Sequence, residues 1–268
     1  MSLNKFINVN HVNLQIKEYG KNPPFDYVVL DDFFKPEIAE KLHLDFPDVN
    51  DGFWQNYNNA IEIKQVCNDW NKFPPNTYKS FSFLNSQPFL DYICEAILPE
   101  LTLYPDSGLN GGGWHSHQRG GKLNTHLDYS LHPKLKLQRK LNIIIYINPN
   151  WKKEWGGALG FWDNKSAMKP GNLITSIWPK FNRAVIFDTT QNSWHGLPEP
   201  LICPENESRK SLAAYFLCKP PVKVDKRSKA LYSPTKEQEN NTEILELIKN
   251  RSDVKTASKY YVWPDTKK

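Results

Sequence analysis

The sequence has few of the features that mark membrane, secreted or zinc-ribbon proteins. Apolar runs such as Ile143–Ile147 are far shorter than the roughly 20 residues that cross a bilayer. The opening residues, MSLNKFINVN, are polar and lack the apolar segment of a secretory signal. The four cysteines are widely spaced: Cys67, Cys94, Cys203 and Cys218. None belongs to a CxxC pair, which excludes a zinc ribbon or a thioredoxin-type site, so we expect a cytoplasmic protein with reduced thiols.

The chain also lacks internal repeats and a strong charge imbalance. Lysine and arginine outnumber aspartate and glutamate by 34 to 29, and the formal net charge is +5. A short basic patch consists of Lys134, Lys136, Arg139 and Lys140. We expect this patch to be a solvated face, and without a basic stripe or a binding motif we expect no nucleic-acid binding. Hydrophobic residues make up 39% of the chain and aromatic residues 13%, which is ample for a globular core.

The pattern of secondary structure changes near residue 100. Residues 25–34 read as a strand, Pro36 suits the first turn of a helix, and a second helix is predicted to begin near Ser86. Residues 50–80 look irregular. From about 100 to 218, short β-rich segments alternate with Gly, Pro, Asn and Asp, which is typical of a sandwich or barrel. We therefore predict an α+β fold with a mainly β core, a jelly roll supported by N-terminal helices.

Three segments are expected within one globular unit. Residues 1–99 form a supporting strand and helical region, 100–222 form the β core, and 223–268 form a C-terminal extension. The extension contains one short helix capped near Thr242, with apolar residues on one side.

A candidate metal site comes from three residues that are far apart in the chain. His126 and Asp128, in KLNTHLDY, are two residues apart and point to the same side of a strand. His195 follows a later strand, residues 183–188, and is the best candidate for a third ligand. Two histidines and one carboxylate leave coordination positions open, as in non-haem Fe(II) oxygenases. Asp128 as a turn cap and His195 as a core histidine are the open alternatives.

Other side chains near these candidates are also of interest. His115, His117 and His132 are spare candidates for the metal. Arg209 heads a strand and is followed by Ser211. A guanidinium there would match a carboxylate by two parallel hydrogen bonds. The alternative is that Arg209 is a surface arginine paired with Glu205 or Glu207, because both carboxylates closely precede it in the chain.

Five sequence blocks follow one another over roughly residues 100–218: KLNTHLDY, RKLNIIIYINPNW, WGGALGFWD, IWPKFNRAVIFDTTQNSWHG and SRKSLAAYFL. In these blocks and their order, the sequence resembles the prolyl 4-hydroxylase-like 2-oxoglutarate/Fe(II) dioxygenases. The resemblance implies a double-stranded β-helix in which His126, Asp128 and His195 bind iron. It also implies that Arg209 and Tyr146 hold the far carboxylate of 2-oxoglutarate, with Ser211 as a further contact.

Two departures from the family pattern concern the co-substrate. The segment between His195 and Arg209 is longer than in the animal oxygen-sensing prolyl hydroxylases, which leaves Lys210 as a substitute for the anchor. The tyrosine that the family often has upstream of the first ligand is missing, and His117 or Gln118 stands in its place.

The resemblance implies a dioxygenase that uses Fe(II), 2-oxoglutarate and O2, with ascorbate as a stimulant. It would hydroxylate an unactivated C–H bond, a prolyl residue being one candidate, and release succinate and CO2. The primary substrate, a peptide or a small molecule, and the oligomeric state stay open. Alternative functions are hydroxylation of a small molecule or sugar, non-catalytic metal binding in a cupin-like protein, and zinc-dependent hydrolysis with the same triad. The glycine-rich segment 111–122 is expected to be a substrate-side loop, and Trp114 and Trp194 are expected in the core.

Overall fold

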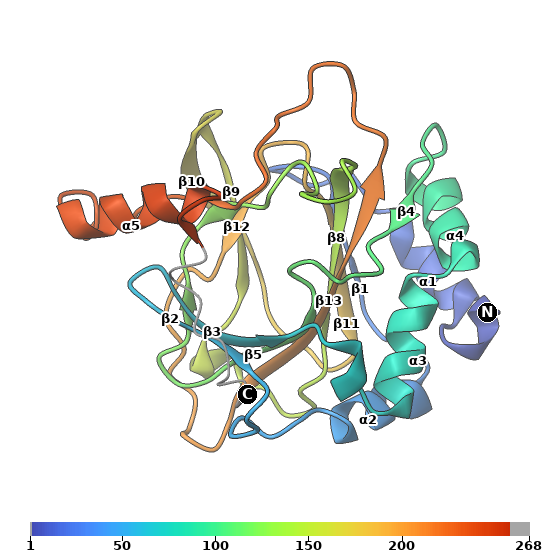
Figure 1. Cartoon of the computed structure of the whole chain (residues 1–268). Helices are drawn as coiled ribbons and strands as arrows, with labels where there is room; N and C mark the ends of the chain where they lie inside the picture. The colour runs from blue at the N-terminus through green and yellow to red at the C-terminus, as the bar shows by residue number, and fades with distance from the viewer. Residues whose placement is uncertain (1, 258–268) are drawn as a thin grey trace.

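Two antiparallel sheets form the centre of the molecule, and four helices cover one of them (Figure 1). The computed structural model describes residues 2–257. The larger sheet has nine strands in the order β1-β11-β8-β13-β5-β3-β2, with β4 beside β13 and β6 beside β3. Its strands are β1 (Tyr27–Leu30), β2 (Gln55–Asn58), β3 (Glu62–Cys67), β4 (Tyr104–Pro105), β5 (Gly113–His117), β6 (Lys122–Leu123), β8 (Gln138–Tyr146), β11 (Arg183–Asp188) and β13 (Arg209–Cys218).

The smaller sheet has five strands in the order β10-β9-β12-β7-β14. They are β7 (His126–Leu127), β9 (Leu159–Ser166), β10 (Lys169–Ile177), β12 (Trp194–Gly196) and β14 (Leu231–Tyr232). The helices are α1 (Val9–Ile16), α2 (Pro36–Leu44), α3 (Pro75–Leu84), α4 (Gln87–Ile97) and α5 (Thr242–Ser252). Short 3-10 turns are η1 (Leu3–Lys5), η2 (Trp70–Lys72) and η3 (Lys153–Trp155). Helices α1–α4 lie together on one side of the molecule and α5 lies on the opposite side (Figure 1).

This architecture confirms the predicted α+β fold with a mainly β, jelly-roll core. Helix α2 begins at Pro36 and helix α4 follows Ser86, as expected. The expectation of an irregular segment at 50–80 was wrong, because β2, β3, η2 and most of α3 lie there. Since β3 pairs with β5, the region before residue 100 contributes strands to the main sheet. The segment boundaries at 99 and 222 stay predictions.

The larger sheet packs its two faces against different partners because side chains alternate along each strand. On β8, Leu141, Ile143 and Ile145 face the helical layer and join the main apolar cluster with residues of α1–α4. Ile144 and Tyr146 face the other way, toward a second cluster with β9 and β11. This second face looks toward the smaller sheet, so it is the face available to a site between the sheets.

A β-bulge interrupts this alternation at the start of β8. Phe216 of β13 pairs with Leu141, but Leu217 pairs with Arg139, so Lys140 is the extra residue. A bulge of this kind re-aims the neighbouring side chain. Arg139 therefore points to the same side as Ile144 instead of joining Leu141 under the helices, and it is buried, with 2% of its surface exposed.

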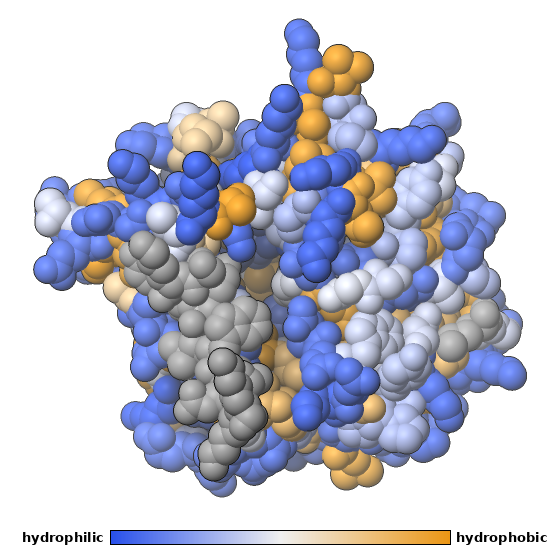
Figure 2. Space-filling view, viewed as in Figure 1, coloured by the Kyte–Doolittle hydropathy of each residue, from blue (hydrophilic) through white to orange (hydrophobic). Residues whose placement is uncertain are grey.

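None of the helices within residues 2–257 combines the length and apolar character needed to cross a bilayer. Figure 2 shows a mainly hydrophilic face on which apolar side chains form scattered spots. All four cysteines are free thiols.

Candidate functional site

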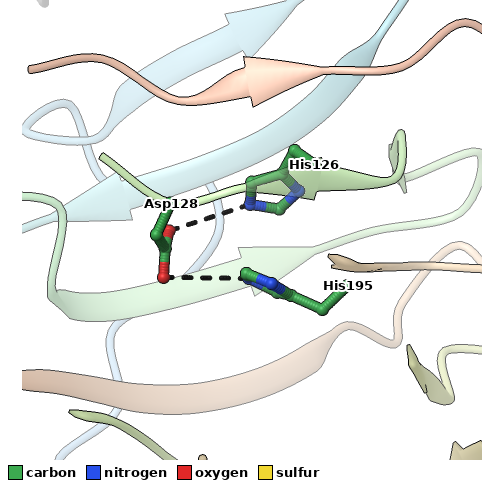
Figure 3. A group of neighbouring side chains, drawn as sticks. All are labelled: His126, Asp128 and His195. Carbon is green, nitrogen blue, oxygen red and sulfur yellow. Dashed lines mark ion pairs between the residues drawn. The ribbon is translucent and has the colours of Figure 1, made fainter. Parts of the chain in front are cut away.

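Two very short strands bring the three candidate metal ligands together. Strands β7 and β12 are antiparallel neighbours, and His126 lies directly opposite His195 in their register. Asp128 follows β7 immediately. The Nε2 atoms of His126 and His195 lie 3.9 and 3.8 Å from the two carboxylate oxygens of Asp128 (Figure 3). One donor atom from each residue lies within 4.8 Å of the others, as the predicted triad requires.

Both imidazoles are fixed in the orientation that a metal ligand needs. Nδ1 of His126 lies 3.0 Å from the carbonyl oxygen of Asn124, and Nδ1 of His195 lies 2.8 Å from that of Ser193. A carbonyl accepts only from a protonated nitrogen, so each Nδ1 donates and each Nε2 keeps its lone pair. Burial lowers the pKa of both histidines, which keeps the rings neutral.

The carboxylate of Asp128 is held deprotonated by its neighbours. Burial opposes its ionisation, but the charge of the Arg139 guanidinium, 3.1 Å away, lowers its pKa. Asn142 donates a hydrogen bond of 3.2 Å to the other oxygen. Arg139 lies between the rings of Tyr129 and Tyr215, at 3.5 and 3.4 Å from their centres. Two neutral imidazoles with free Nε2 lone pairs and one carboxylate fit a divalent iron ion.

Arg209 and Tyr146 meet on the larger sheet. Arg209 is buried, its Nε donates to the carbonyl oxygen of Gly157 at 2.7 Å, and its Nη2 donates to the Tyr146 hydroxyl at 2.9 Å. Gly157 has a positive φ of 81°, and a Cβ there would lie 2.9 Å from Cδ of Arg209. Ser211 lies opposite Tyr146 in the register of β13 and β8.

This geometry excludes the surface role considered for Arg209. Within the described chain no carboxylate lies within 4.0 Å of it, and Glu205 pairs with Arg119 instead. Its positive charge is therefore buried without a negative partner of the protein. The ammonium of the neighbouring Lys210 lies elsewhere, 5.5 Å from the centre of the Phe46 ring.

One cavity of about 380 Å³ connects the two groups of residues. Its walls include the metal triad and Ser228–Ala230 from one side, and Arg209, Ser211 and Lys64 from the larger sheet. His115 and His117 also line it. They belong to β5, so the expectation of a loop for the whole segment 111–122 was wrong.

The remaining candidates have structural roles. His132 accepts backbone hydrogen bonds at Nδ1 from Lys134 and Leu135, and its Nε2 faces Asp106 at 3.6 Å. Trp114 and Trp194 are buried in the core, with 1% and 0% of their surface exposed, as expected.

Several residues of the site were missed from the sequence. Arg139 was expected on a solvated face, which was wrong because the bulge turns it inward to Asp128. The Tyr232 ring stacks on His126 with 5.1 Å between ring centres, and its hydroxyl donates to Glu62 at 3.0 Å. Glu62 also accepts from Nε of Arg251 at 2.8 Å. Tyr232 is 170 positions from Glu62 and Arg251 is 189 positions from it, so no local sequence pattern could reveal these pairs.

Comparison with known proteins gives a family match and several relatives. Residues 112–217 match the family model of the 2OG-Fe(II) oxygenase superfamily. Prolyl 3-hydroxylase OGFOD1 of Mus musculus is 31% identical over 88 residues, which are 31% of this chain and 16% of that protein. The chain thus spans 16% of the length of this curated relative.

Two solved structures share the fold. A Pseudomonas putida prolyl-4-hydroxylase has a TM-score of 0.55 at 12% identity, over 78% of this chain and 100% of that chain. A prolyl 4-hydroxylase from Phytophthora capsici has a TM-score of 0.51 at 20% identity, over 92% of this chain and 76% of that chain. These likenesses confirm the predicted double-stranded β-helix.

Proposed function

We propose that this chain, whose residues 112–217 belong to the 2OG-Fe(II) oxygenase superfamily, is a 2-oxoglutarate-dependent dioxygenase that hydroxylates an unactivated C–H bond. One observation carries the proposal: a metal-ligand triad and a buried arginine without a carboxylate partner line the same cavity. A purely structural metal site has no need of a second, cationic anchor. This combination also disfavours the cupin-like and zinc-hydrolase alternatives.

The residues would divide the work as follows. His126, Asp128 and His195 would hold Fe(II), and Arg209 with Tyr146 would hold the far carboxylate of 2-oxoglutarate. Bound iron would supply activation of O2 coupled to oxidative decarboxylation of 2-oxoglutarate, which yields succinate and CO2. Ascorbate would act as a stimulant by keeping the iron reduced.

Other side chains would prepare the site. Arg139 keeps Asp128 ionised and fixes one of its oxygens. The carbonyls of Asn124 and Ser193 hold the imidazole tautomers. Apolar wall residues such as Ile144 and Leu159 limit the access of water to the cavity.

We propose a prolyl residue as the target, because the relatives named above are prolyl hydroxylases. A small molecule or sugar stays the alternative substrate. The two classes differ in the product: a peptide library would reveal a gain of one oxygen on proline by mass spectrometry, whereas a small-molecule hydroxylase would leave every peptide unchanged.

The test of the reaction class is succinate formation. The protein is incubated with Fe(II), ascorbate and 2-oxoglutarate, and succinate is measured against Asp128→Ala and against His43→Ala as a distant histidine control. We expect succinate from the wild type and from His43→Ala only. Equal succinate formation by Asp128→Ala, or none by the wild type together with no calorimetric binding of 2-oxoglutarate, would refute the proposal.

A further inference from the structure

A row of nitrogen-containing side chains crosses three neighbouring strands of the larger sheet. Arg209 of β13 lies directly opposite His117 of β5. On the other side of β5, Gln65 of β3 pairs with Ser116, and continuing this antiparallel register places Lys64 across from His117. Directly opposite residues share a face, with Cβ atoms about 5 Å apart. All three side chains line the cavity.

At the Lys64 end of this row, an ammonium shares a carboxylate with a second cation. The Lys64 ammonium faces Glu62 at 3.3 Å, and only 13% of this side chain is exposed. Glu62 is fully buried and already accepts hydrogen bonds from Arg251 and Tyr232. One carboxylate thus faces two cations, and Lys64 has three N–H donors to place. The far carboxylate of 2-oxoglutarate would neutralise Arg209, so the N–H donors of Lys64 would remain available to a second anion.

His117 adds an unused hydrogen-bonding group between the two cations. It is 2% exposed, and neither ring nitrogen has a hydrogen-bond partner in the described chain. Burial, followed by the charges of Arg209 and Lys64, lowers its pKa, so the ring is neutral and carries one N–H donor. Buried polar groups nearly always have partners, and a ligand in the cavity would supply one here.

We infer that Lys64 and His117 form a second oxyanion subsite, separate from Arg209 and Tyr146, which receives a carboxylate of the primary substrate. His117 would then contact the primary substrate instead of the co-substrate suggested by its position in the sequence. The inference rests on the proposed function, in which 2-oxoglutarate occupies the Arg209 end. The target C–H bond would then belong to a molecule with a nearby carboxylate, such as an acidic side chain of a peptide or the free carboxylate of an amino acid. Lys64 lies outside residues 112–217, so the family match covers only the His117 half of this subsite.

Trifluoroacetate, a monocarboxylate observed by fluorine NMR, tests the subsite directly. The full chain is loaded with Zn(II) in place of iron and saturated with 2-oxoglutarate, and the line width of the probe is measured as protein is added. We expect saturable broadening in the wild type. Lys64→Met and His117→Phe should each weaken binding about tenfold, the loss of one charge-assisted hydrogen bond. His117→Gln keeps a donor and should weaken it less.

Lys210→Met is the matched control, because Lys210 is also a lysine of the larger sheet but lies against Phe46. It should bind the probe as the wild type does. Thermal melts establish that each variant folds, and if Lys64→Met does not, Lys64→Arg and His117→Phe carry the test. Lack of saturable binding to the protein saturated with 2-oxoglutarate, or equal affinity in wild type and His117→Phe, would overturn the inference.

The experiment separates this inference from the proposed function. Calorimetry measures 2-oxoglutarate binding to the same Zn(II) protein independently of the probe. If 2-oxoglutarate binds but the probe does not, the dioxygenase proposal stands and the second subsite is wrong. If the probe binds through Lys64 while 2-oxoglutarate does not bind at all, the oxyanion subsite stands and the dioxygenase proposal falls.

To learn which carboxylate source fits, the probe is displaced with L-proline, L-prolinamide, acetyl-Asp-Pro-amide and acetyl-Asn-Pro-amide. Displacement by L-proline but not L-prolinamide identifies a free amino acid. Displacement by the aspartyl but not the asparaginyl peptide identifies an acidic peptide. Equal displacement by the charged and uncharged members of both pairs would contradict the requirement for a carboxylate.

Discussion

The two sheets that face each other across the cavity are built differently. The two metal-ligating histidines lie on β7 and β12, which have two and three residues, and Asp128 directly follows β7. Arg209 and its neighbours lie on strands such as β8 and β13, which have nine and ten residues. Long strands are fixed by their own hydrogen-bond ladders. Very short ones need support from elsewhere, so the ligand geometry depends on contacts made from outside β7 and β12.

Those supporting contacts come from both sides of the cavity. Arg139 reaches Asp128 from β8 of the larger sheet, and Tyr232 stacks on His126 from β14. The difference between the sheets predicts separable effects: substitutions on the smaller sheet should change metal affinity, and those at Arg209 should change 2-oxoglutarate affinity. Arg139, which bridges the sheets, should resemble the smaller sheet although it belongs to the larger one.

The largest effect is expected for His126→Ala. Removing a direct ligand should lower metal affinity by more than the roughly 10- to 100-fold that loss of a supporting contact costs. Competition with a chromophoric chelator for Zn(II) or Fe(II) measures this. His43→Ala on α2 is the control and should keep wild-type affinity. Wild-type metal affinity in His126→Ala would mean that the triad is not the metal site.

The next effect is expected for Arg209→Met. Loss of the Arg209 guanidinium should raise the Michaelis constant for 2-oxoglutarate by about 10- to 100-fold, which corresponds to one or two charge-assisted hydrogen bonds. Metal affinity in the chelator assay should not change. Lys210→Met is the matched control. If Lys210→Met raised the constant and Arg209→Met did not, the anchor would have been assigned to the wrong residue.

Arg139 tests whether the larger sheet supports the triad. Arg139→Met should lower metal affinity about tenfold, because Asp128 would lose the charge that keeps it ionised and the contact that fixes it. Arg139→Lys keeps the charge and should recover part of the loss. The constant for 2-oxoglutarate, measured at saturating metal, should stay within about twofold. The opposite pattern, with metal affinity intact, would show that β7 fixes Asp128 without help.

The triad could be predicted because histidine and aspartate can bind a metal and because strand periodicity shows which side chains share a face. The spacing of His126 and Asp128 puts both on one side of the chain, and the jelly-roll order brings His195 opposite His126. Sequence reasoning also singled out Arg209, and the family resemblance added Tyr146; the structure places the two side chains in hydrogen-bond contact. Their roles toward iron and 2-oxoglutarate stay predictions that the experiments above test.

What sequence reasoning missed follows from irregular backbone and from long-range pairing. Strict alternation places Arg139 on the same face as Leu141, and only the bulge at Lys140 reverses it. Strands β2 and β3 fall in a stretch rich in Asn, Pro and aromatic residues, where strand periodicity is weak. Glu62 and Tyr232 form a buried hydrogen-bonded pair although they are 170 positions apart, and such a pair has no local sequence signature.

The smallest effect is expected at Asp31. Its partner Arg183 is not among the described residues that line the cavity. Asp31 accepts from Nε and Nη2 of Arg183 at 2.6 and 3.0 Å and faces Lys180 at 3.0 Å. The hydrogen bond from Arg183, in spite of partial burial, lowers its pKa below the ordinary value of 3.8. A lowered pKa in the folded state stabilises the protein above pH 4 or so, and this stability is lost as the pH falls through the folded-state pKa.

Asp31→Asn should therefore lower the free energy of unfolding by about 1 kcal/mol at pH 7, a value reduced by the exposure of the pair. The difference from wild type, measured by urea unfolding, should shrink toward zero as the pH falls below the ordinary aspartate range. Metal and 2-oxoglutarate affinities should be unchanged. If Asp31→Asn weakened either one, the ends of β1 and β11 would be coupled to the cavity, and the separation of roles between the two sheets would not hold.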